Sequence, residues 1–91
     1  MSVVWKYEIA ITDDQVVEMP EGAELLHVGQ QQPGTLALWA RVIPTGQQIE
    51  RRVILVRGTG HQIWTQPYVG TVQDGLGLVW HVFDGGIEGA E

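Results

Sequence analysis

Short segments of alternating apolar and polar side chains, separated by glycine- and proline-containing turns, most constrain the fold of this chain. In residues 3–11 the apolar side chains that recur at every second position are Val3, Trp5, Tyr7, Ile9 and Ile11. A period of two is typical of a β-strand that buries one face. Further strands are predicted over residues 15–19, 25–28, 35–43, 49–57, 68–72 and 78–83.

Turn residues separate these segments at short intervals. Residues 19–22 carry proline second and glycine fourth, as in a type I turn, and Pro33-Gly34 fits the centre of a type II turn. Six to seven short strands joined in this way, with no long helix, predict an all-β protein, built as a compact antiparallel sandwich or barrel. We expect a single β domain over residues 1–83 and a flexible, acidic, glycine-rich tail over residues 84–91.

Chain length and residue content limit the kind of protein further. The 91 residues can form one hydrophobic core but not two, and the absence of cysteine excludes disulfides and thiolate metal sites. The beginning of the chain lacks a signal-peptide pattern, and no apolar run reaches the roughly 20 residues that span a bilayer. We therefore expect a cytoplasmic protein with no membrane partner.

The charge is negative and unevenly distributed. Eleven acidic side chains against five basic ones give a net charge of −6. Such a chain repels a phosphate backbone at long range, so general nucleic-acid binding is not expected. Four of the five basic residues nevertheless lie between Arg41 and Arg57, which leaves a local basic patch open.

Several predicted strands are apolar on both faces. Residues 53–56 read Val-Ile-Leu-Val, and Arg41 is the only polar residue within 36–43. A second apolar face needs cover from another layer of the same chain or from another copy of it. This pattern is compatible with central strands in a monomeric sandwich and equally with a homo-oligomer in which another copy covers the second face.

Candidate catalytic residues are few. Ser2 is the only serine, and no cysteine is available as a nucleophile. His27, His61 and His81 are far apart and show no zinc-binding spacing. We therefore expect neither enzyme activity nor a metal or cofactor.

The densest group of ligand-type residues lies between residues 51 and 64. Arginine offers a planar fork for phosphate, glycines beside a threonine let backbone N–H groups converge on an anion, and tryptophan offers a stacking face. An ordinary turn between strands is the simpler explanation of the same glycines. The hypothetical ligand site comprises Arg51, Arg52, Arg57, Gly58, Thr59, Gly60, His61 and Trp64.

Six motifs follow one another over residues 5–83: WKY at 5–7, MPEGA at 19–23, LWA at 38–40, GTGH at 58–61, YVGT at 68–71 and VWHVF at 79–83. As an ordered set they resemble a family of small, uncharacterised proteins encoded by tailed bacteriophages. The resemblance implies a phage setting, with the host cytoplasm as the location. It supplies no catalytic residues and marks residues 58–61 as a shared feature.

Three functions are compatible with these observations. The leading hypothesis is a non-enzymatic phage accessory protein, in a counter-defence role, that sequesters a small anionic, nucleotide-like ligand as a homo-oligomer. The first alternative is an inhibitor that blocks a host protein through an acidic N-terminal surface, made of Glu8, Asp13, Asp14, Glu18, Glu21 and Glu24. The second alternative is a minor virion or assembly protein.

Overall fold

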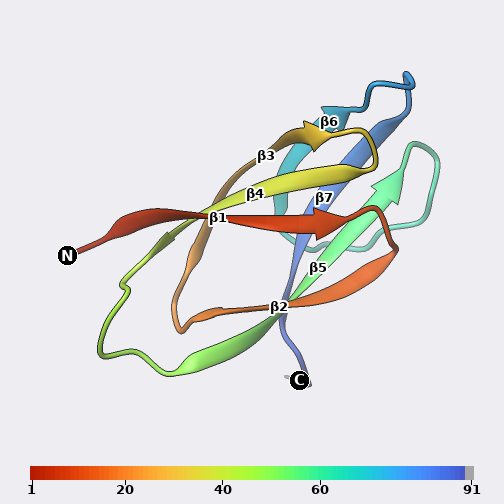
Figure 1. Cartoon of the computed structure of the whole chain (residues 1–91). Helices are drawn as coiled ribbons and strands as arrows, with labels where there is room; N and C mark the ends of the chain where they lie inside the picture. Colours follow the sequence, from red (N-terminus) through yellow and green to blue (C-terminus); the bar gives the residue numbers. More distant parts are fainter. Residues whose placement is uncertain (90–91) are drawn as a thin grey trace.

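The computed structural model describes residues 1–89, which form seven strands and no helix (Figure 1). The strands are β1 (Val3–Ala10), β2 (Asp14–Pro20), β3 (Glu24–Gln32), β4 (Thr35–Val42), β5 (Ile49–Gly58), β6 (Tyr68–Gln73) and β7 (Val79–Ile87). All neighbouring strands pair antiparallel. The predicted all-β class is confirmed, and each predicted segment corresponds to one observed strand.

The strands form two sheets packed face to face. One has three strands in the order β1-β4-β3, and the other has four in the order β2-β5-β7-β6. The sheets are in direct contact where β3 meets β6, because a Cβ added at Gly70 would lie 2.8 Å from Val28 Cγ1. Glycine at position 70 therefore lets the two sheets meet, and the fold is a sandwich.

The core lies between the inner faces of the two sheets. Alternate residues of the central strands point into it: Leu36 and Leu38 on β4, Ile54 and Val56 on β5, and Val82 on β7, all at most 2% exposed. A second buried group, formed by Met19, Ala23, Ala40 and Val42, continues the core toward the other end. The strand alternation seen in the sequence thus identifies the buried face correctly.

The connection between β5 and β6, residues 59–67, covers part of the outer face of the four-stranded sheet. β5 and β6 both pair antiparallel with β7, so they run parallel, and this connection must cross β7 (Figure 1). Phe83 points outward on β7, opposite to Val82, yet is only 8% exposed. At Phe83, the second apolar face of β7 is therefore covered by the chain itself, whereas Val79 and His81 on the same face are half-buried.

The end of the domain differs from the expectation. The sequence placed the last strand's end at Phe83, with a flexible tail after it, but β7 continues to Ile87. A register shift between Arg52 and Ile54 of β5 accommodates the extra residues, and Gly86 has a φ of 81°, which favours glycine. Beyond the strand, the Glu88 N–H donates to the Arg51 carbonyl at 2.7 Å. Residues 90–91 of the expected tail lie outside the described residues.

An aspartate organises the turn between β6 and β7. The Asp74 carboxylate accepts hydrogen bonds from the Trp80 indole at 3.0 Å and from the backbone N–H groups of Leu76 and Leu78. The indole and then the backbone donors hold the pKa of Asp74 below its usual value.

Residues 1–89 contain no helix with the length and apolarity needed to cross a membrane.

Candidate binding site

β5 carries all three arginines of the predicted site, but it separates them. Arg51 and Arg52 lie near its beginning and Arg57 near its end. Arg52 and Arg57 are five positions apart, which at about 3.3 Å per strand residue corresponds to roughly 16 Å. Arg52 is also buried on the inner face, whereas Arg51 and Arg57 belong to the outer face. The three guanidinium groups therefore do not converge on one small ligand.

Arg52 is the centre of a buried ionic cluster. Its guanidinium donates to Asp84 at 3.0 Å, to the Ala23 carbonyl at 2.9 Å, and to Glu50. The side chains of Arg52 and Glu50 are only 9% and 8% exposed, so each needs the other as a counter-charge. Because two carboxylates surround one guanidinium, this end of β5 does not attract an anion.

Arg51 lies on the surface and is paired twice. Its guanidinium donates to Glu88 at 2.7 Å and to Glu18 at 3.2 Å. The hydrogen bond and charge of Glu88, followed by those of Glu18, raise the pKa of Arg51 above its usual value. Arg51 thus connects β2, β5 and the segment after β7.

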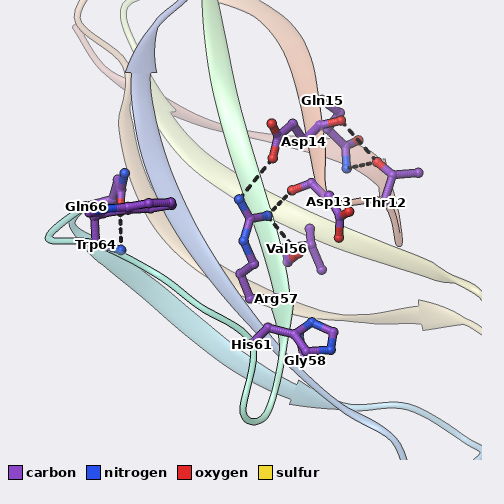
Figure 2. A network of polar contacts seen from close by, with 10 residues as sticks. All are labelled: Thr12, Asp13, Asp14, Gln15, Val56, Arg57, Gly58, His61, Trp64 and Gln66. Atoms are coloured by element: carbon purple, nitrogen blue, oxygen red, sulfur yellow. Dashed lines mark hydrogen bonds and ion pairs between the residues drawn. The ribbon is translucent and has the colours of Figure 1, made fainter.

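Arg57 reaches toward the turn between β1 and β2 rather than toward the residues that follow it (Figure 2). Its Nη1 donates to the Asp13 carbonyl and to the Val56 carbonyl, and its Nη2 donates to the Asp14 carboxylate at 3.1 Å. The Asp13 carbonyl also accepts from the Val56 N–H at 3.0 Å. The Arg57 guanidinium therefore stabilises the 13–14 turn and is already occupied.

Residues 58–61 form a β-turn closed by its own histidine. The His61 N–H donates to the Gly58 carbonyl at 3.1 Å, and the Gly58 N–H donates to His61 Nδ1 at 3.2 Å. Gly60 has a φ of 90°, as the third residue of a type II turn requires. One of the backbone N–H groups proposed for an anion is thus used within the turn. Because Nδ1 accepts, the neutral imidazole carries its proton on Nε2.

A network of hydroxyl groups around His81 joins the predicted site residue Thr59 to three residues that were not predicted, His81, Thr71 and Tyr68. His81 Nε2 shares a hydrogen bond with Thr59 Oγ1 at 2.9 Å, and Nδ1 shares one with Thr71 Oγ1 at 3.1 Å. Thr71 Oγ1 is bonded in turn to the Tyr68 hydroxyl. The sequence signal was the presence of threonine and histidine on neighbouring strands, but the register of β6 against β7 was needed to join them.

Three pockets adjoin the 58–61 turn, and one of them, of about 390 Å³, is lined by Gly58, Thr59, His61 and residues 77–80. The other two differ in size. The smaller, of about 250 Å³, is lined by Arg57, Gly58, Thr59, Gly60, His61, Ile63, His81 and Phe83. The larger, of about 420 Å³, is lined by Asp13, Asp14, Arg57, His61, Gln62 and Trp64. Trp64 is 64% exposed, well above the 41% of Trp5, and its backbone N–H donates to Gln66 Oε1 at 3.2 Å (Figure 2).

A family model described as a domain of unknown function, DUF7352, matches residues 1–90. The chain belongs to the DUF7352 family. No curated protein and no solved structure matches it. The family domain includes both sheets, the 58–61 turn and these pockets, so the candidate site is part of the domain itself.

Of the eight predicted site residues in this DUF7352 domain, five gather at one pocket, Trp64 lies at another, and two lie elsewhere. Arg57, Gly58, Thr59, Gly60 and His61 line the smaller pocket. Arg51 and Arg52 belong to separate ion pairs at the other end of β5. Trp64 lines only the larger pocket of the two, which adds Asp13 and Asp14 to the candidate residues. Within residues 1–89, no three histidine or acidic side chains gather in a way that could hold a metal ion.

Proposed function

We propose that this DUF7352 protein is a non-enzymatic binding protein whose partner is another protein. The contact surface, called here the Trp64 surface, consists of Asp13, Asp14, Arg57, His61, Gln62 and Trp64. The observation that carries the proposal is a 64% exposed tryptophan at a pocket of about 420 Å³ that two aspartates also line.

The charges of the Trp64 surface favour a basic partner. Asp13 and Asp14 bring two carboxylates and Arg57 one guanidinium, so the three charged side chains sum to −1. Arg57 is paired with Asp14, while Asp13 uses only its backbone carbonyl in the contacts within residues 1–89. A lysine or arginine of the partner can pair with Asp13 and lie over the Trp64 ring.

The Trp64 surface also has the form of an interface anchor. Tryptophan is among the residues that contribute most to the binding energy of protein interfaces, especially where an aromatic ring fills a pocket surrounded by polar residues. Three of the six acids expected to form a broad N-terminal surface, Asp14, Glu18 and Glu24, are paired with arginines of the same chain. The acidic part of the proposed contact surface therefore comprises fewer carboxylates than the six that the sequence analysis named. In the phage setting that the motifs suggest, the partner would be a host protein.

The proposal is tested by capture from a bacterial lysate on the tagged protein. Proteins retained by the parent at low salt should be lost with Trp64→Ala and with Asp13→Asn, and should elute as salt screens the charges. Leu76→Ala is the matched control, because Leu76 is 81% exposed and outside the Trp64 surface. If both variants retained the same proteins as the parent, the Trp64 surface would not be the contact.

A second candidate function is capture of a small ligand in the pocket of about 250 Å³. The supporting observation is that His61 Nε2 makes no hydrogen bond within residues 1–89, while Ile63 and Phe83 provide an apolar wall. The volume lies below the roughly 300–1,000 Å³ of ordinary ligand pockets, which suits a phosphate or a single ring better than a whole nucleotide.

Native mass spectrometry of protein purified from bacterial lysate tests this second candidate. A retained small molecule appears as excess mass that vanishes on denaturation. The mass should be lost with His61→Ala and kept with Arg57→Ala, because the guanidinium of Arg57 is directed to Asp13 and Asp14. The opposite pattern would restore the arginine-centred site predicted from the sequence.

A further inference from the structure

β1 is an edge strand of the three-stranded sheet, and its outer side pairs with no other strand within residues 1–89. Its other side pairs with β4 from Val3 to Ala10 without a register shift. In an extended strand the N–H and C=O groups of successive residues point to opposite sides. Every second residue of β1 therefore directs its backbone groups away from β4.

The side chain of Gln15 identifies which residues these are. The Ala10 N–H donates to Gln15 Oε1 at 3.0 Å, and Gln15 Nε2 donates to the Ala10 carbonyl. The backbone groups of Ala10 therefore point away from β4, and those of Val4, Lys6 and Glu8 must do the same. The Gln15 amide acts at Ala10 as a neighbouring strand would, which leaves the outward groups of Val4, Lys6 and Glu8 for another strand.

We propose that this edge pairs with β1 of a second copy of the chain, antiparallel and about a twofold axis at Tyr7. In this register Lys6 lies opposite Glu8 of the other copy, and the symmetry repeats the pair. Trp5, which is 41% exposed, lies opposite Ile9 of the other copy. The two three-stranded sheets join into one continuous sheet across the dimer.

Charge complementarity selects a second copy as the occupant. Lys6 and Glu8 both point to the outer face of the sheet, where Lys6 Nζ lies 3.4 Å from Gln31 Oε1. A lysine on an edge strand ordinarily discourages pairing, because an incoming strand without an opposite charge at that position would have to pack against the ammonium group. Here the same strand, turned about its own centre, supplies the opposite charge at the required position. In the Tyr7 register the backbone pairs formed are those of Lys6 and Glu8. Val4 lies opposite Ala10 of the other copy and stays outside the new ladder, because the Gln15 contact with Ala10 remains in place.

The test is sedimentation of the full chain over a wide range of protein concentration, with charge reversals on β1. Lys6→Glu and Glu8→Lys should each weaken the dimer by on the order of tenfold, because each puts like charges at two symmetry-related positions. The double variant K6E/E8K should recover parental association, since it exchanges the two charges. Glu21→Lys is the control, because it makes the same charge change as Glu8→Lys in the exposed turn after β2.

Amide hydrogen exchange followed by NMR gives a second readout. Exchange at Lys6 and Glu8 should slow as concentration rises, whereas exchange at Tyr7 and Ile9, whose N–H groups face β4, should be slow throughout. A chain that remains monomeric at millimolar concentration overturns the proposal. A dimer that both single reversals leave intact, or that K6E/E8K fails to restore, also overturns it.

Discussion

The two ends of β5 use arginine in opposite ways. At one end Arg52 is buried with Glu50 and Asp84, and at the other Arg57 reaches out to the turn at residues 13–14. The carboxylate paired with Arg57, that of Asp14, is 65% exposed, whereas that of Glu50 is 8% exposed. The same residue type on one strand therefore serves the interior at one end and a candidate contact surface at the other. What decides between these roles is the face of the strand and the residues in register beside it.

The largest expected effect is on the free energy of unfolding, and it distinguishes the two ends of β5. Arg52→Ala leaves the Glu50 carboxylate buried without its counter-charge, so unfolding in urea should show a loss of about 3–5 kcal/mol. Arg52→Met, combined with Glu50→Gln and Asp84→Asn, should lose less, because no buried charge is left unpaired. A single Arg52→Ala variant as stable as the parent would mean that both ends of β5 are surface-like.

Arg57→Ala should have a smaller effect on stability. The side chain of Arg57 is 15% exposed, but its ionic partner is open to solvent, so we expect a loss of about 1 kcal/mol in the same measurement. The variant should also free the Asp14 carboxylate and strengthen capture of basic proteins on the Trp64 surface. If Arg57→Ala destabilised the chain as much as Arg52→Ala, the contrast between the two ends would fail.

Arg51→Ala should change stability least. Its guanidinium and both of its carboxylate partners are about half exposed, so water and salt replace the lost contacts. The unfolding midpoint should remain closest to the parent's among the three arginine variants, and raising the salt concentration should narrow the remaining difference. A midpoint below that of Arg57→Ala would show that the Glu88 contact holds the end of β7 in place.

The sequence predicted the strands well because alternation and turn residues are local signals. Pro20, Gly22 and Gly34 lie where the predicted turns occur. The buried residues of β5 follow the expected period, as do those of β4 apart from Ala37, which is buried on the opposite face. The last strand was placed too short, since residues 84–87 contain two glycines and no alternation. Their pairing with β5 depends on a register shift that only the assembled sheet shows.

The candidate site was predicted less well because its contacts are distant in the sequence. Arg51, Arg52 and Arg57 are close in the chain, but a strand is extended and alternates faces, so closeness in sequence places them apart. The residues that bind Arg57 lie 43 and 44 positions earlier. The role of His81 likewise depended on its spatial neighbours, Thr59 in the turn after β5 and Thr71 on β6.

The position of β7 within its sheet has a consequence for how the chain reaches its native state. β7 is the last strand of the seven and yet lies between β5 and β6, so β6 cannot complete its pairing before residue 83 has been synthesised, nor β5 before residue 87. A nascent chain that stops after β6 exposes the Val-Ile-Leu-Val segment at 53–56 without its main neighbour. Folding is therefore expected to follow release of the last strand from the ribosome, and to begin with the local β6–β7 hairpin before it docks on β5.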